Sequence, residues 1–297
     1  MKTNIHICSY ARDFRYLFYG LRSIVKFMSG FNEITLLIPT RDIPIFMQSI
    51  PDDLKDKLGN FIKVIYFDEW ENKGMLHHEY KVLTADIDCP NADYILHLDS
   101  DIVITKPMDV SEFFYENKPI LMHSLYTTLE KIQPNLLLWQ VAVTNALGWI
   151  PEREFMRSRF LTYKRTLYSK TRELIENNTK QPVDQYIKDQ RNEFPQTFAE
   201  YPTLGEVAWK FFHDDYHWVD TDKGEHLEFL EPDRKVRQLW SHQPPTDDDI
   251  ELFNSNSLNA LLKIIEEPSK NNYFFLINNK SKPLLETIKS RTLEIKI

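Results

Sequence analysis

Short apolar runs alternate with amphipathic stretches through the first hundred residues, and this alternation limits the possible folds more than any other feature. The predicted strands cover 4–8, 33–39, 61–67 and 94–98, and the predicted helices cover about 13–28 and 76–83. Strands that alternate with helices form a parallel sheet with both faces covered. We therefore expect an α/β fold built on a Rossmann-type, mostly parallel sheet with helices on both faces.

Two aspartates, Asp99 and Asp101, follow the last of these predicted strands. Ligands of such sheets bind beyond the carboxyl ends of the strands, where these side chains are expected to lie. Two carboxylates one residue apart can hold a hard divalent cation that keeps open positions for the phosphates of a ligand. We expect Mn²⁺ or Mg²⁺ at Asp99 and Asp101, with Asp99 also facing the substrate. The alternative is an acidic turn that binds nothing.

Glycine is scarce, with 7 residues in the chain, and no two of them are separated by a single residue. The Rossmann fingerprint and the Walker A loop both need clustered glycines, because backbone amides must approach phosphate closely. Neither motif occurs in this sequence. A bound nucleotide diphosphate would therefore be held through a metal ion, which favours the metal-binding interpretation of Asp99 and Asp101.

The loop after the first predicted strand carries three more candidate substrate-binding residues, Ser9, Arg12 and Asp13. It lies at the same edge of the expected sheet as the aspartate pair, so these side chains can hold the base and ribose of a nucleotide. For Asp13 the alternative is a helix N-cap, which needs no ligand.

The helix before the aspartate pair is predicted to carry His77, His78 and Lys81 on its polar side. Lys81 is a candidate for binding a phosphate, because its ammonium group acts as a compact positive charge. A solvated helix face without a ligand is the alternative interpretation of the same three residues.

Two candidates lie late in the chain. His242 is a possible third metal ligand, since a neutral imidazole completes an oxygen-rich site and suits manganese better than magnesium. The alternative is an ordinary histidine at a domain edge.

Glu200 lies in a polar and aromatic patch, 198–201, that suits a sugar, and it is the candidate general base for an acceptor hydroxyl. Hydrogen bonding to that hydroxyl, or simple exposure to solvent, are the alternatives for Glu200.

Composition and charge exclude several classes of protein. The net charge of -8 argues against a general nucleic-acid binder, which needs a basic surface to neutralise phosphates. The two cysteines, Cys8 and Cys89, have no metal-like spacing and suit a reducing compartment. No apolar stretch approaches the length of a membrane span. We expect a cytoplasmic protein that can still lie at the periphery of a membrane.

Five segments together resemble the GT-A glycosyltransferase superfamily, over roughly residues 1–245: IHICSYARDF, EITLLIP, YILHLDSDIVITKP, FAEYPTLGEVAW and LWSHQPP. The likeness is strongest to small bacterial and phage members. It implies a nucleotide-diphosphate-sugar donor bound over the first half of the sheet and a glycan or other hydroxyl acceptor. It also implies that Asp99 and Asp101 hold the metal and donor, while His242 matches the late histidine that completes the metal shell in several families.

Changes in composition predict how the chain is divided. Within a glycosyltransferase-like domain at 1–245, residues 1–110 form the expected nucleotide-sugar-binding half. Residues 111–245 form the expected acceptor-side half, where the pattern changes to longer, aromatic-rich helices broken by prolines. Prolines followed by three aspartates predict a linker at 246–254. The remaining segment, 255–297, has a reversed charge balance and a short α/β pattern of its own.

The C-terminal segment resembles a different family. LNALLKIIEEPSKNNYFFLINNKSKPLLETIKSRT is similar to the clamp-loader AAA+ subunits, delta-prime and gamma, of bacterial DNA polymerase III. Ser290 and Arg291 match the motif that supplies an arginine finger there, with Thr292 where cysteine is usual. Walker A, Walker B and the lid are absent, so we expect no ATP hydrolysis. Such a segment is expected from a gene fusion, or from a reading frame assembled from two genes.

The sequence therefore predicts a metal-dependent glycosyltransferase that moves a sugar from a nucleotide-diphosphate donor to an acceptor hydroxyl, in surface polysaccharide or glycan synthesis. Inverting and retaining mechanisms are both open. Two alternatives come from other functional classes. One is an interaction protein that binds clamp-loader subunits through the C-terminal segment, and the other is a catalytically inactive binder of nucleotide sugars.

Overall fold

The computed structural model describes residues 1–192, 197–229 and 231–239. The chain up to Leu239 forms one compact unit. The predicted boundary at 245, the predicted linker at 246–254 and the C-terminal segment at 255–297 all lie outside the described residues.

A five-stranded sheet forms the centre of this unit, in the strand order β11-β5-β1-β3-β4. Its strands are β1 (Thr3–Cys8), β3 (Glu33–Pro39), β4 (Ile62–Phe67), β5 (Tyr94–His97) and β11 (Leu161–Lys164). The first four are parallel to one another, and β11 runs antiparallel to β5. The predicted α/β fold with a mostly parallel sheet is therefore confirmed.

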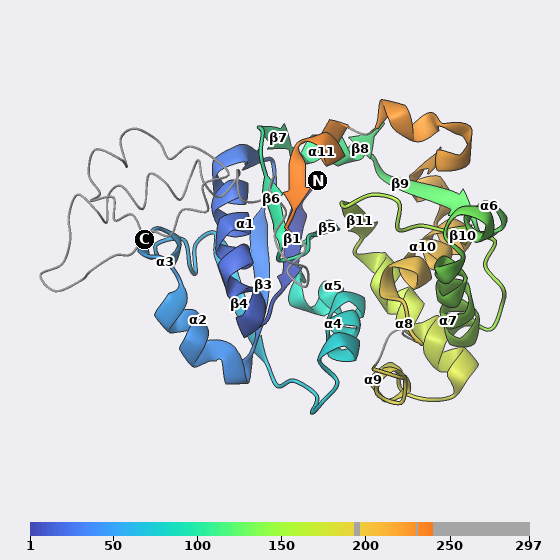
Figure 1. Ribbon diagram of the computed structural model, residues 1–297, viewed down its shortest axis with the longest axis horizontal. Coiled ribbons are helices and arrows are strands. Elements are labelled where there is room, and N and C mark those ends of the chain that lie inside the picture. Colours follow the sequence, from blue (N-terminus) through green and yellow to red (C-terminus); the bar gives the residue numbers. More distant parts are fainter. Residues whose placement is uncertain (193–196, 230, 240–297) are drawn as a thin grey trace, which may run out of the picture. The chain divides into compact units, whose positions relative to one another are not determined.

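Helices cover both faces of this sheet (Figure 1). On one face, α1 (Phe14–Phe27) packs Leu17 and Leu21 into a core with Ile5 and Leu36. On the other face, α4 (Gly74–Leu83) and α5 (Ala85–Asp88) share a core with Ile95 of β5. Two-sided burial explains the nearly continuous apolar runs of the strands, which is typical of parallel sheets.

A second, four-stranded sheet lies in the later half of the chain. Its strands are β8 (Phe114–Tyr115), β9 (Lys118–Leu125), β10 (Arg153–Glu154) and β12 (His217–Asp220). The prediction of a mainly helical segment after residue 111 was therefore wrong in part. The strand β9 is buried at most of its positions, so its apolar run lacks the alternation that would distinguish it from a buried helix.

The helices of this later half are α6 (Tyr126–Ile132), α7 (Leu137–Leu147), α8 (Thr166–Thr179), α9 (Val183–Lys188), α10 (Glu200–Phe211) and α11 (Glu231–Arg234). The remaining helices are α2 (Ile43–Ser49) and α3 (Asp52–Lys55). Two short pairs complete the structure: β2 (Met28–Ser29) with β7 (Met108–Asp109), and β6 (Ile102–Ile104) with β13 (Val236–Gln238). Among the described residues, no helix has the length and apolar character needed to cross a membrane.

Candidate functional site

The aspartate pair occupies a turn between β5 and β6, at the carboxyl end of the central sheet. The amide of Leu98 donates to the carbonyl of His6 at 3.2 Å, which fixes the end of β5 beside β1. The amide of Ile102 donates to the carbonyl of Asp99 at 3.2 Å and closes the turn. Asp99 is exposed, whereas Asp101 is 6% exposed. The position that the sequence predicted for these carboxylates is therefore the one they occupy.

Gln238 joins the two carboxylates. Its Nε2 donates to Oδ2 of Asp99 at 3.3 Å and to Oδ1 of Asp101 at 3.3 Å. The strand β13 brings this side chain to the turn, because it pairs antiparallel with β6 and places Gln238 opposite Ile102. The amide of Leu239 then donates to the carbonyl of Asp101 at 2.8 Å. Both aspartates therefore direct an oxygen at the same point.

The local electrostatics favour a cation at this point. Desolvation by the surrounding protein raises the pKa of Asp99 to about 6, and the charge of Asp101 adds to this effect. Because Asp99 is exposed, desolvation of its carboxylate is incomplete. The negative charge of Asp101 by itself also raises the pKa of Asp99. A divalent cation would remove this repulsion, so the pair is suited to binding one.

Glu200 is the first residue of α10 and is half-buried. Burial raises the pKa of its carboxyl to about 7, and the charge of Asp99 contributes to the rise, while the backbone amide of Glu200 opposes it. A carboxyl with a pKa near 7 is partly ionised at neutral pH and can accept a proton there. The fold thus brings the predicted base within electrostatic range of the predicted metal ligands.

A fourth carboxyl, Glu79 of α4, lies within electrostatic range of Glu200. Glu79 is 4% exposed, and its Oε2 has no hydrogen-bond partner among the residues that the structure describes. Burial raises its pKa well above the usual range, and the charge of Glu200 adds to this. Sequence analysis missed Glu79, because its helix carries no pattern that marks a single buried acid.

The loop after β1 is held in place by several hydrogen bonds. Ser9 is fully buried, and its Oγ has no partner within the described ranges. The hydroxyl of Tyr10 donates to the carbonyl of Gly74 at 3.0 Å, and the amide of Ala11 donates to Oδ2 of Asp42 at 2.9 Å. These contacts fix the loop against the start of α4 and against Asp42, the N-cap residue of α2.

Arg12 and Asp13 follow in that loop. Arg12 is exposed, and its Nε donates to Oδ2 of the buried Asp13 at 3.4 Å. Asp13 occupies the N-cap position of α1, but its side chain makes no capping hydrogen bond. The alternative role as a side-chain cap is therefore wrong, and a role for Asp13 in binding a substrate stays a prediction.

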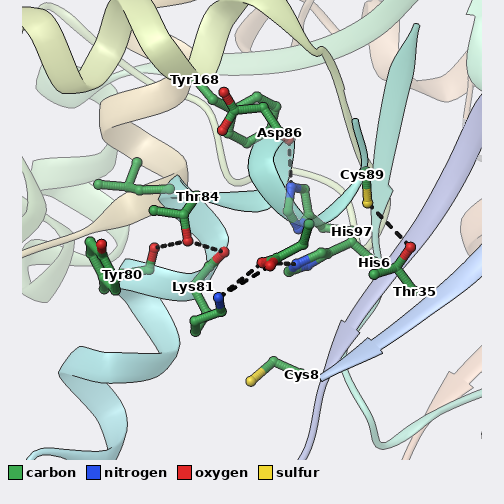
Figure 2. Close-up of polar contacts among 12 residues, drawn as sticks. His6, Cys8, Thr35, Tyr80, Lys81, Thr84, Asp86, Cys89, His97 and Tyr168 are labelled. Atoms are coloured by element: carbon green, nitrogen blue, oxygen red, sulfur yellow. Dashed lines mark hydrogen bonds and ion pairs between the residues drawn. The ribbon is translucent and has the colours of Figure 1, made fainter. Parts of the chain in front are cut away.

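Lys81 points into the protein rather than toward the aspartate pair. Its Nζ lies 3.0 Å from Oδ2 of Asp88, which in turn lies 3.8 Å from Nε2 of His6. Figure 2 shows the side chains of Lys81 and His6 directed at a carboxylate between them, which is that of Asp88, with His97 beside His6. The side chain of Lys81 is 13% exposed. The structure thus gives Lys81 an internal partner, and its predicted contact with a phosphate stays untested.

The histidines beside Lys81 are not on a solvated helix face. His77 is 4% exposed, stacks on Trp70 with the ring centroids 4.4 Å apart, and accepts the backbone N–H of Trp70 at 3.0 Å on Nδ1. His78 is half-buried near Tyr10, and burial lowers its pKa to about 4. The expectation of a shared polar side was wrong, because α4 is covered by α9 and α10.

The aspartate pair is not part of a larger group of candidate metal ligands among the described residues. In the part of the chain that the structure describes, no group of three or more His, Cys, Asp or Glu side chains is arranged to hold a metal. His242 lies outside the described residues, three positions beyond Leu239, which is bonded to Asp101. Asp99 and Asp101 therefore fit a cation as a partial site that needs further oxygen or nitrogen ligands.

A cavity of about 500 Å³ lies at the opposite end of β5 from the aspartate pair. Its lining includes Asp93, Tyr94 and Lys164, and none of the predicted site residues. The candidate site is therefore the surface at the carboxyl end of the sheet, where Asp99, Asp101, Glu200 and Gln238 gather.

Comparison with known families gives a match to the C-terminal segment of the chain. A family model described as DNA polymerase III, delta subunit, matches residues 248–297. No curated protein matches the chain. The resemblance of the C-terminal segment to a subunit of DNA polymerase III is thereby confirmed, and the segment belongs to the part of the chain outside the described residues.

Proposed function

We propose that this protein is a metal-dependent glycosyltransferase that moves a sugar from a nucleotide-diphosphate donor to an acceptor hydroxyl. The observation that carries the proposal is the pair of carboxylates at the carboxyl end of β5, both directed at the Gln238 amide. Ligands of open α/β sheets bind at this edge. The absence of clustered glycines from the sequence supports a metal as the holder of the diphosphate.

Asp99 and Asp101 would hold Mn²⁺ or Mg²⁺, with His242 as a further candidate ligand. When bound, the cation supplies positive charge that stabilises a leaving nucleotide diphosphate. The exposure of Asp99 supports its contact with both cation and donor, whereas the buried Asp101 is suited to holding the cation.

Glu200 is the candidate general base. Its raised pKa, about 7, supports removal of the proton from an acceptor hydroxyl at neutral pH. This role would make the transfer inverting, because the base deprotonates the nucleophile that attacks the sugar directly. If Glu200 only hydrogen-bonds the acceptor, a retaining reaction stays open.

The reaction itself is the test. The full-length protein is incubated with a panel of nucleotide-diphosphate sugars, Mn²⁺ and candidate glycan acceptors, and release of nucleotide diphosphate is measured. We expect metal-dependent release with one donor family, and loss of release in Asp101→Asn. A folded wild-type protein that turns over no donor, although it binds one, would instead indicate the inactive nucleotide-sugar binder.

A second candidate function is supported by the match of residues 248–297 to the DNA polymerase III delta-subunit family. In this alternative, the protein binds clamp-loader subunits through that segment. Pull-down by the full-length protein with purified clamp-loader subunits tests it, with Arg291→Ala as the paired variant. Binding that Arg291→Ala abolishes would favour this alternative, and no binding would leave the glycosyltransferase proposal as the better account.

A further inference from the structure

Gln238 is fixed beside the aspartate pair by backbone hydrogen bonds on both sides of it. The amide and the hydroxyl of Thr105 donate to the carbonyl of Lys235 at 2.7 and 2.9 Å. On the other side, the amide of Leu239 donates to the carbonyl of Asp101 at 2.8 Å. The ammonium group of Lys235 also lies 2.5 Å from Glu112 Oε2. The backbone of β13 is therefore anchored, and the terminal amide of Gln238 can rotate without moving it.

The distances from the Gln238 amide to the two carboxylates match those between neighbouring ligands in a coordination shell. The amide nitrogen of Gln238 lies 3.3 Å from an oxygen of each aspartate. Neighbouring oxygens around an octahedral ion with bonds of about 2.0–2.1 Å are about 2.9 Å apart, and around Ca²⁺ they are about 3.3–3.7 Å apart. A small contraction would therefore place the head group of Gln238 as a ligand adjacent to an oxygen of each carboxylate around one cation.

We propose that Gln238 is a ligand of the cation at Asp99 and Asp101, and that its amide rotates by half a turn when the cation binds. Without a cation, the NH₂ group faces two acceptors and offsets their repulsion. With a cation, the carbonyl oxygen takes the same place, because amide nitrogen and oxygen have similar size and the last torsion is nearly two-fold. A neutral amide oxygen is a hard ligand, which suits Mg²⁺, Mn²⁺ or Ca²⁺.

This inference rests on the proposed function, in that it takes Asp99 and Asp101 to bind a divalent cation. It assigns a role to β13, which sequence analysis did not recognise as part of the site. The role differs from simple positioning of the carboxylates. A positioning residue would need only the NH₂ donor, whereas a ligand needs an oxygen.

Two substitutions separate these roles. Gln238→Leu removes both donor and oxygen, while Gln238→Glu removes the donor but keeps an oxygen and adds charge. Binding of Mn²⁺ alone to the full-length protein is measured from the electron paramagnetic resonance signal of free Mn²⁺. Gln48→Leu and Gln48→Glu, at an exposed position of α2, serve as matched controls. Circular dichroism confirms that each variant is folded.

We expect Gln238→Leu to weaken Mn²⁺ binding by about tenfold or more, Gln238→Glu to bind at least as tightly as wild type, and the Gln48 controls to be unchanged. Equal weakening by both Gln238 variants would overturn the ligand role in favour of positioning, and wild-type binding by Gln238→Leu would overturn both roles. If Gln238→Leu does not fold, Gln238→Glu against wild type decides. Asp101→Asn separates the ligand role of Gln238 from the metal site itself. If wild type and Asp101→Asn bind Mn²⁺ equally, or if neither binds it, the proposed metal site fails.

Discussion

Gly20 of α1 lies directly against Ile102, the first residue after the aspartate turn: a Cβ on Gly20 would come within 2.7 Å of the Ile102 carbonyl oxygen. Ser23, one turn later, donates its hydroxyl to the carbonyl of Gly20 at 2.7 Å and accepts the amide of Ile104 at 2.8 Å. The helix α1 therefore approaches β6 closely at the backbone of Gly20 and at the hydroxyl of Ser23, and its apolar side chains share a core with Ile102 and Ile104. This contact sets the position of the strand that carries the turn.

Gly20→Ala is expected to destabilise the protein by about 1–3 kcal/mol, because the added methyl must displace a backbone carbonyl. Helix propensity alone would predict that Gly20→Ala stabilises the protein, because it favours Ala over Gly by about 1 kcal/mol. Urea unfolding measures the difference. A variant more stable than wild type would show that α1 and β6 are not in this close contact.

Lys81→Met is expected to lower the free energy of unfolding by about 3 kcal/mol, because it removes the ammonium group from the buried Asp88 carboxylate. The neighbouring His6 is a poor replacement, since burial lowers its pKa and disfavours a positive charge there. The double variant Lys81→Met/Asp88→Leu should recover part of that loss, since it removes the stranded charge. Urea unfolding of both variants gives the comparison. Unchanged stability, together with weaker donor binding, would instead support the predicted contact of Lys81 with a phosphate.

Buried neutral histidines make stability depend on pH. Burial lowers the pKa of His77 from 6.5 to about 4, so between these values the unfolded chain binds a proton that the folded chain does not. The stability that this histidine contributes is therefore complete above pH 6.5 and falls as the pH is lowered, by about 1.4 kcal/mol per pH unit.

His77→Asn tests this dependence, because its side-chain oxygen can still accept the Trp70 amide at the place of Nδ1. Urea unfolding at several pH values should give a slope below pH 6 that is smaller by about 1.4 kcal/mol per pH unit than in wild type. An identical slope in both proteins would mean that His77 titrates normally in the folded state.

Glu200→Gln is expected to reduce turnover by about 10²–10⁴-fold while leaving donor affinity unchanged. In wild type, kcat/KM should rise with pH and level off above an apparent pKa of about 7, since the ionised carboxylate is the base. Initial rates across the neutral range check both points. Full turnover by Glu200→Gln would remove the base role and leave the retaining reaction as the alternative.

The parts of the fold that depend on local pattern could be predicted from the sequence. The run Glu33–Pro39 is a strand with the predicted bounds, and the helix predicted over 13–28 is Phe14–Phe27. These segments have strong periodicity and two buried faces, so neighbouring residues suffice to assign them. The same reasoning placed Asp99 and Asp101, because the end of a buried strand is a local feature.

Contacts between distant segments could not be predicted. Gln238 meets Asp99 across 139 residues, and this depends on the pairing of two three-residue strands that carry almost no pattern of their own. The only signal was its position directly before the segment LWSHQPP, which holds His242. Likewise, the partner of Lys81 is set by the packing of α4 against α5, which helix periodicity does not specify.

Metal-dependent binding of a donor tests the central claim most directly. The thermal stability of the full-length protein is measured against a panel of nucleotide sugars, with and without Mn²⁺, for wild type and Asp101→Asn. We predict that one nucleotide family raises the melting temperature of wild type only when Mn²⁺ is present, and that Asp101→Asn loses this effect. A folded wild-type protein that no donor stabilises with Mn²⁺, or an Asp101→Asn variant stabilised as strongly as wild type, would contradict the proposed donor site.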